Sequence, residues 1–332
     1  MTTAKSEPQK KRHHFVPKAY LKAFCDENGR LHVYRKDAPQ RALRLQPDST
    51  QFQTYYYSQP MPDGGQDNNT LENVFAAIET DWPATVNALH RRENINQRLQ
   101  NLFEFMSLQR VRVPAARDMA EAVNAQIVKS TLNMLYDAGK LPPLPGGRAL
   151  LEAVEVSIDP HRSIHAMPFM VQGMAELFNV IGLGALHNLT PIPFLTSDNP
   201  VIWFDPSKKF AEQLPYTVDL QHGDIQFLFP ISPKLMIVGT RDLGESYSRN
   251  GLAHGEISDA EFVDAVNAQI CRFAYESVIS STPGQENLVS AFADESPVLE
   301  TQDLPIAGGG FSHFRHIFGK RKPKPRWQTK QG

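Results

Sequence analysis

The chain is organised around one N-terminal stretch, which reads His13-His14-Phe15-Val16-Pro17-Lys18-Ala19-Tyr20-Leu21-Lys22-Ala23-Phe24. Pro17 suits the first helical position, because its ring fixes φ and its missing N–H would lack a partner there. Val16 precedes this proline and is therefore held extended, which places the break between strand and helix near residues 16/17. Tyr20 and Phe24 then lie four residues apart on one apolar face. The stretch predicts a short strand that carries two histidines and runs into a helix.

A histidine at a strand end, next to a helix N-terminus, is suited to acid–base, metal or anion chemistry. We therefore expect His14 to be catalytic, as a general base or a ligand, and we expect a functional site at this break. The sequence indicates where the site lies rather than which reaction it performs.

The composition describes one large domain or two intimate ones. The chain has 332 residues, 41% of them hydrophobic and 21% charged, with a net charge of −2. This balance indicates no global attraction to nucleic acid or membrane. The two cysteines, Cys25 and Cys271, are far apart in the sequence, and the polar N-terminus carries no secretory signal, which favours free thiols in a reducing cytoplasm. The apolar window 164–189 contains polar side chains, so we expect a buried helix and no membrane span.

The order of the elements predicts the fold. Helical periodicity dominates residues 70–187, whereas residues 30–35, 53–57 and much of 188–281 read as strands. Neither group of strands is numerous enough to bury a face alone. We therefore expect a single α+β domain at residues 12–282, with a long-helix middle section and a mostly antiparallel sheet from N-terminal and C-terminal strands.

The two ends of the chain are expected to be loose. We predict a disordered N-terminus at residues 1–11 and a loose C-terminal extension at residues 283–332 that ends in a basic tail. Residues 1–10 and 311–332 should be dispensable for folding, because their composition buries too little apolar area.

Two later segments carry polar side chains in structured surroundings. Gln109, Arg110 and Arg112 stand before a helix kink at Pro114, where guanidinium groups could hold an anion or pair with acidic residues of a neighbouring helix. The turn Ser197-Asp198-Asn199-Pro200 joins two strands, and its carboxylate is either a turn former or a strand-end ligand or base.

The helix that starts near residue 70 carries two glutamates. Asn69 is expected to cap it, with Glu72 reaching back in a capping box. Glu79 lies at the edge of the apolar stripe. It could point into a site between helices, but a boundary carboxylate that reaches solvent is the favoured interpretation.

Three segments together resemble a known family. Residues 14–24 match the pattern His-x-Val-Pro-x-x-Tyr-Leu-x-x-Phe, and residues 109–114 and 194–201 match two later segments. In this respect the chain resembles a largely bacterial family catalogued as domain of unknown function 4238. The resemblance implies a domain at about residues 12–282 and adds weight to Asp198, but it implies no established reaction.

Several enzyme classes are excluded by their missing motifs. The chain has no Walker phosphate loop, no dinucleotide-binding glycine fingerprint and no Gly-x-Ser-x-Gly elbow. His13-His14-x-x-Pro17 resembles the opening of HNH-type metal nucleases, but the second half of that motif is missing. A divalent metal therefore stays one option as cofactor, and its ligands are unknown.

Two function classes remain from the sequence. The first is a hydrolase-like enzyme that acts on a phosphorylated or nucleic-acid substrate through one cleft shared by His14, Asp198 and Arg110 or Arg112. The alternative is a non-catalytic protein that binds a small anionic ligand or nucleic acid, in which these residues are structural. The catalytic candidates are His14 and Asp198, and the oligomeric state is left open. The expected ligand-binding residues come from the same three segments: His13, Tyr20, Gln109, Arg110, Arg112 and Asn199.

Overall fold

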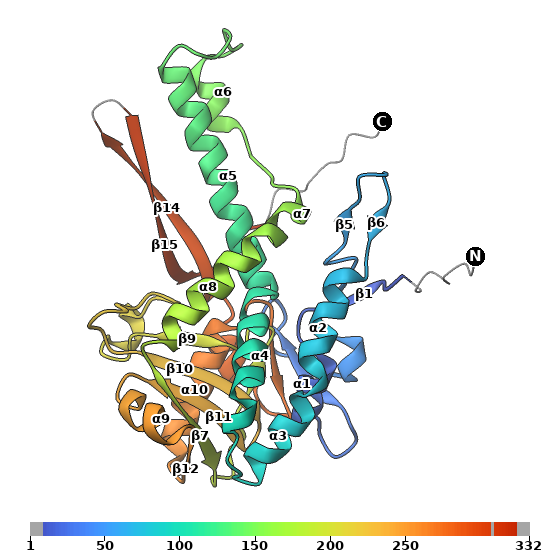
Figure 1. Cartoon of the computed structure of the whole chain (residues 1–332). Helices are drawn as coiled ribbons and strands as arrows, with labels where there is room; N and C mark the ends of the chain where they lie inside the picture. The colour runs from blue at the N-terminus through green and yellow to red at the C-terminus, as the bar shows by residue number, and fades with distance from the viewer. Residues whose placement is uncertain (1–8, 307–308, 324–332) are drawn as a thin grey trace, which may run out of the picture.

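The computed structural model of the chain describes residues 9–306 and 309–323. Its middle section is helical, as the periodicity predicted, and the long helix α5 extends away from the body of the molecule (Figure 1). The helices of this section are α2 (Thr70–Thr80), α3 (Trp82–His90), α4 (Leu99–Val111), α5 (Pro114–Asp137), α6 (Arg148–Ala153), α7 (Pro160–Ser163) and α8 (Met167–Phe178). No helix within the described ranges is both long and apolar enough to cross a membrane.

Two sheets form the body, and together with the helices they confirm the predicted α+β domain. A five-stranded sheet has the order β12-β7-β11-β10-β9, antiparallel except for the parallel pair β12 and β7. Its strands are β7 (Gly182–Asn188), β9 (Ile202–Phe204), β10 (Gln226–Ser232), β11 (Leu235–Thr240) and β12 (Ala253–Ile257). The helices α9 (Gly244–Asn250) and α10 (Ala260–Phe273) belong to the same half of the chain.

The second sheet joins the two ends of the domain. It is antiparallel, with the order β3-β2-β13-β8. Its strands are β2 (Leu31–Arg35), β3 (Ala42–Leu45), β8 (Thr196–Ser197) and β13 (Ser277–Ser280). N-terminal and C-terminal strands therefore share one sheet, which confirms the prediction.

The opening motif connects both sheets to the helices. Strand β1 (Arg12–His14) pairs with β4 (Phe52–Thr54), and the helical turns α1 (Lys18–Leu21) and η1 (Lys22–Phe24) follow. Pro17 is extended, with ψ at 142°, so it precedes the helix as its cap instead of occupying the first helical position. The buried Tyr20 hydroxyl donates to the Pro230 carbonyl at 2.7 Å and lies 2.6 Å from Thr196 Oγ1. This side chain therefore fixes the motif against β8 and β10.

One expected helix boundary is wrong. The helix expected in the apolar window 164–189 ends at Phe178, and strand β7 of the five-stranded sheet begins at Gly182. Strand β7 begins at a glycine, Gly182, where a Cβ would lie 2.3 Å from the Leu243 backbone. The glycine thus permits a close approach of β7 to the start of α9.

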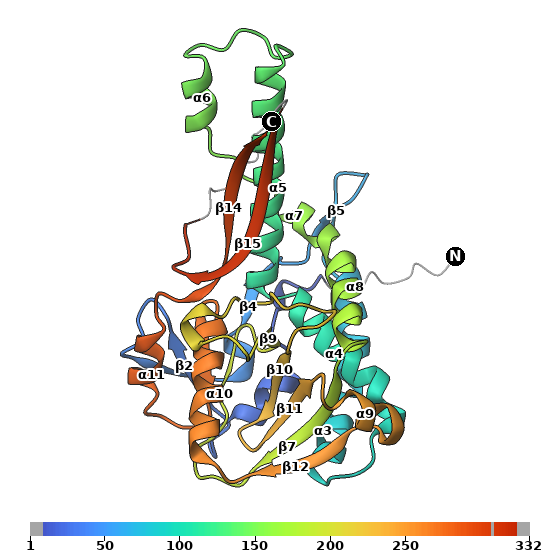
Figure 2. The same cartoon turned by 90° about the vertical axis from the view of Figure 1, so that its left-hand side faces the viewer.

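The expected loose C-terminal extension is structured over most of its described length. It contains α11 (Glu286–Ala291) and a long hairpin of β14 (Ser296–Ile306) and β15 (Gly309–Gly319), which lies along α5 (Figure 2). The Phe318 ring packs edge-on against Phe273, with centroids 4.8 Å apart. Residues 311–319 are therefore part of a strand and not of a loose tail as expected. The predictions for residues 1–8 and for the basic tail at 324–332 lie outside the described residues.

The remaining short elements lie near the opening motif or in connections. They are β5 (Gln59–Pro60), β6 (Gln66–Asp67), η2 (Pro47–Ser49), η3 (Asn96–Arg98), η4 (Ile164–Ala166) and η5 (Phe210–Glu212).

Candidate functional site

A cleft with a volume of about 560 Å³ lies between the opening motif and α2. Its walls contain the His14 imidazole and seven charged side chains. The basic ones are Lys10, Arg12, Lys18 and Lys22, and the acidic ones are Asp48, Glu72 and Glu79. A cleft with convergent titratable groups is the default candidate for a functional site.

His14 lines this cleft and has one ring nitrogen to which no described residue forms a hydrogen bond. Its Nε2 is buried and has no hydrogen-bond partner within the described residues. Burial, with a smaller contribution from Lys18, lowers the pKa of His14 to about 4. A hydrogen bond to the Asp48 backbone raises the pKa of His14, because it favours the protonated ring. In this bond the backbone oxygen accepts and a ring N–H donates. This bond leaves Nε2 as the lone-pair nitrogen of a neutral imidazole at neutral pH.

Glu72 and Glu79 face the same cleft from α2. Their spacing of seven residues places both on one face of the helix. Burial, assisted by the negative charge of Glu79, raises the pKa of Glu72 to about 7. Its carboxylate accepts no hydrogen bond from the described part of the chain, so it is free to meet a ligand. Glu72 is therefore a carboxyl group that holds a proton close to neutral pH.

Glu79 is held by the arginine behind the cleft. Arg112 is 1% exposed, and its Nη1 donates to Glu79 Oε1 at 2.7 Å. Its Nη2 donates to Gln109 Oε1 at 3.1 Å, and Gln109 Nε2 donates to the Phe15 carbonyl at 3.0 Å. This chain of bonds fixes α2 and α4 against the opening motif and keeps a cation next to the two carboxylates.

Both glutamates differ from their predicted roles. The expected capping box is not formed: Asp67 Oδ1 accepts the N–H groups of Asn69 and Thr70 at 2.9 and 3.0 Å. Glu79, expected at a solvent boundary, is half-buried and ion-paired with Arg112. The shared helix face of the two residues was readable from their spacing, but the facing segment comes from more than fifty residues earlier in the chain.

His13 and Tyr20 have their polar groups occupied by the fold. His13 is fully buried: its Nδ1 accepts from the Tyr57 N–H at 2.8 Å, and its Nε2 donates to the Lys10 carbonyl at 3.1 Å. Tyr20 is buried in the core against Phe229. Neither side chain lines the His14 cleft.

Asp198 lies in a different environment from His14. It is 1% exposed, and its oxygens accept the backbone N–H groups of Tyr275, Glu276 and Ser277 at 2.8, 2.5 and 3.1 Å. Burial raises its pKa to about 7, against the effect of two of these N–H donors. The carboxylate holds the strand turn to the start of β13 and does not line the cleft. The expectation of one cleft shared by His14 and Asp198 is therefore not met.

Arg110 and Asn199 lie near one another, on the other side of α4. The Arg110 guanidinium centre is 3.8 Å from the Tyr216 ring centroid. Asn199 Nδ2 donates to the Tyr216 hydroxyl at 2.6 Å and to the Phe273 carbonyl at 2.8 Å. Of the two predicted arginines, only Arg112 accompanies His14.

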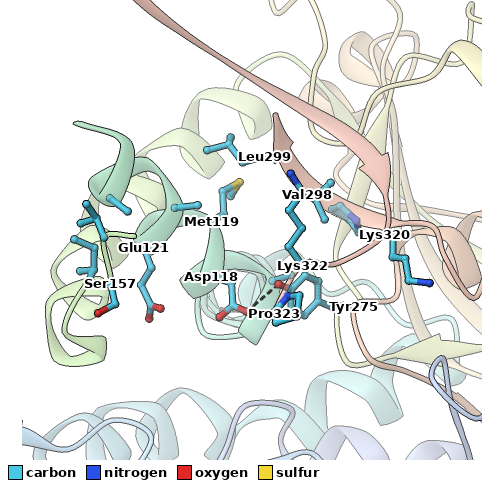
Figure 3. A pocket seen from close by; sticks show the side chains of 16 residues that line it. Asp118, Met119, Glu121, Ser157, Tyr275, Val298, Leu299, Lys320, Lys322 and Pro323 are labelled. Carbon is cyan, nitrogen blue, oxygen red and sulfur yellow. Dashed lines mark hydrogen bonds between the residues drawn. The ribbon is translucent and has the colours of Figure 1, made fainter. Parts of the chain in front are cut away.

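A further cavity of about 310 Å³ lies between α5 and the base of the C-terminal hairpin (Figure 3). Figure 3 shows Asp118 on α5 and Tyr275 across the gap, and the Tyr275 hydroxyl donates to Asp118 Oδ2 at 2.8 Å. Met119, Val298 and Leu299 make much of its wall apolar. The sequence could not indicate this cavity, because the extension that closes it was expected to be loose.

Metal and thiol chemistry find little support in the described residues. No group of three or more His, Cys, Asp or Glu side chains among them is arranged to hold a metal ion. Cys271 is fully buried, and burial raises the pKa of its thiol to about 12. Burial also raises the pKa of Cys25. Neither thiol is therefore a ready nucleophile.

Comparison with known proteins supports the resemblance seen in the sequence. A family model described as "Protein of unknown function (DUF4238)" matches residues 12–284. No curated protein and no solved structure matches the chain.

Proposed function

The chain belongs to the family DUF4238, and we propose that it is a hydrolase that cleaves phosphate esters, in a phosphorylated or nucleic-acid substrate, by general acid–base catalysis. The observation that carries the proposal is the pairing of two titratable groups in one cleft. His14 is a neutral base with an unused Nε2, and Glu72 is a carboxyl group with a pKa near neutrality. Acid–base sites typically contain two titratable groups whose environments shift their pKa values so that one is a base and the other an acid at the working pH.

The basic side chains of the cleft are suited to an anionic substrate. Lys18 and Lys22 are exposed, are four residues apart on adjoining helical turns, and form no ion pair within the described residues. Lysine ammonium groups bind phosphate as point charges, and Arg112 adds positive potential from behind. The cleft contains both basic side chains and carboxyl groups. It is therefore suited to a substrate that has an anionic group and a leaving group that must accept a proton.

In the proposed reaction, His14 Nε2 accepts a proton from a water molecule while the water oxygen attacks phosphorus. The bond between phosphorus and the leaving oxygen breaks, and the Glu72 carboxyl group donates its proton to that oxygen. The products of a diester are a phosphate monoester and an alcohol. Exchange with solvent then returns His14 to its neutral form and Glu72 to its acid form.

The proposed roles predict the pH dependence of kcat/KM. Activity should require neutral His14, which is present above pH of about 4, and protonated Glu72, which is present below pH of about 7. The profile should therefore be bell-shaped, with limbs near these two values. A fluorescent oligonucleotide is a suitable substrate, because its diester groups keep one charge throughout this range.

The Glu72→Gln variant tests the assignment of the acid. It should lose the alkaline limb, and its activity loss should be much larger for an oligonucleotide, whose alkoxide leaving group needs a proton, than for bis(p-nitrophenyl) phosphate. Glu245→Gln, at an exposed glutamate on α9, is the matched control. An unchanged alkaline limb in Glu72→Gln would remove Glu72 from the mechanism. Phosphate binding without turnover of either substrate would favour a binding protein.

The setting proposed for this reaction is the cytoplasm. Both cysteines are free, and Cys271 is buried, so the fold does not depend on an oxidising compartment.

A further inference from the structure

We propose that the cavity beside Arg110 is a second binding site, which takes an amphipathic carboxylate, that is, one carboxylate group on an apolar body. The cavity has a volume of about 270 Å³ and lies on the opposite side of α4 from the His14 cleft. Its walls come from α4, α5, α8, β9 and the connection that follows β9, and His316 of β15 also lines it.

Among the described residues, none accepts a hydrogen bond from Nε or Nη1 of the Arg110 guanidinium group. Arg110 is 5% exposed, and both of these nitrogens are buried. The other buried arginines differ. Arg112 pairs with Glu79, Arg117 donates to Ser163 Oγ, and Arg272 donates to Glu295.

Aromatic rings hold this cation in place without satisfying its N–H groups. The guanidinium centre lies 3.8 Å from the Tyr216 ring centroid and 5.5 Å from that of Trp203. Cation–π contacts stabilise the cation only modestly, whereas burying an ion without a hydrogen-bonding partner costs considerably more. An anion in the cavity would accept the unused N–H groups and remove this penalty.

The chemistry of the walls selects the class of ligand. Met174, Leu177 and Trp203 make the cavity apolar beside the arginine, which favours a ligand with an apolar body. His316 adds no second positive charge to that of Arg110. Burial and the nearby Arg110 lower the pKa of His316 to about 4, so its ring is neutral at neutral pH. The exposed Glu176 at the cavity repels a ligand in proportion to its negative charge, and so disfavours a dianion more than a monoanion. A monoanionic carboxylate fits these conditions better than a phosphate dianion, and the volume is suited to a small ligand.

Calorimetry with octanoate and octanol tests the proposal on the full chain. Wild type should bind octanoate at least tenfold more tightly than octanol, which has the same chain length and no charge. Arg110→Met should weaken octanoate binding at least tenfold and leave octanol binding unchanged. Arg249→Met, at an exposed arginine of α9, should behave as wild type. Equal affinity for the two ligands, or unchanged octanoate binding in Arg110→Met, would overturn the proposal.

Two further measurements keep the test decisive. Arg110→Met should fold with at least the stability of wild type, because it replaces an unpaired buried charge with an apolar side chain of similar length. If this variant does not fold, the thermal midpoint of wild type decides: at equal concentration octanoate should raise it clearly more than octanol, and equal shifts would overturn the proposal. Arg110-dependent binding of inorganic phosphate, stronger than that of octanoate, would contradict the carboxylate assignment. Because octanoate should not compete with diester hydrolysis, the result is independent of the proposed reaction.

Discussion

Replacing His14 with asparagine should reduce kcat/KM for oligonucleotide hydrolysis by about 10²–10⁴-fold, the usual contribution of a general base. The asparagine amide keeps a donor that can bond the Asp48 backbone, but it offers no basic nitrogen in place of Nε2. Substrate binding should change little, because the basic side chains of the cleft remain. The loss should therefore appear mainly in kcat, measured by steady-state kinetics at pH of about 5.5, midway between the two pKa values.

A matched substitution separates this effect from general damage. His222→Asn changes an exposed histidine in a loop outside the cleft and should retain wild-type activity. The thermal midpoint of His14→Asn should stay close to that of wild type. A folded His14→Asn protein with full activity would show that His14 is not the base.

Asp198→Ala should lower the free energy of unfolding by about 3–4 kcal/mol, because it leaves three backbone N–H groups, two of them in buried hydrogen bonds, without their acceptors. These donors lie at the start of β13, so the loss should loosen the sheet that joins the two ends of the domain. Denaturant unfolding at neutral pH measures the effect.

The matched control for Asp198 is another turn carboxylate. Asp63 is exposed and accepts one backbone N–H, from Gly65 at 3.0 Å, so Asp63→Ala should cost less than about 1 kcal/mol. The folded fraction of Asp198→Ala should keep wild-type kcat at low temperature. A variant that folds as stably as wild type but has lost activity would return Asp198 to a catalytic role.

Local sequence signals predicted much of the fold. The proline step, the apolar spacing of Tyr20 and Phe24, and the alternation in residues 30–35 are set by neighbouring residues, so they were readable in advance. Each half offered too few strands for a sheet of its own, which correctly indicated that N-terminal and C-terminal strands share one sheet, as β2 and β13 do. Helix geometry also contains a signal that sequence reasoning missed. Arg110 and Arg112 are two positions apart at a helix end, and side chains at this spacing point to opposite sides of the helix, which separates the two guanidinium groups.

The remainder depended on contacts between distant segments. Glu72 reads locally as part of a helix cap, and only the packing of α2 against the opening motif turns it into a cleft residue. Asp198 reads as a strand-end base, yet its acceptors are filled by backbone from residues 275–277. The C-terminal hairpin was expected to be loose because glycines and charged residues interrupt the alternation of apolar and polar residues in its sequence. In the structure it packs against α5 and α10.

The central claim is that His14 is a neutral base at an anion-binding cleft. Nitrogen-15 NMR of the histidine side chains, titrated over pH with and without inorganic phosphate, tests it most directly. In the free protein the pKa of His14 should lie near 4, with Nδ1 carrying the proton of the neutral ring. Phosphate should raise this pKa, because a nearby anion favours the imidazolium form, and should leave the His222 signals unchanged. A His14 that titrates like an exposed histidine and does not respond to phosphate would contradict the account.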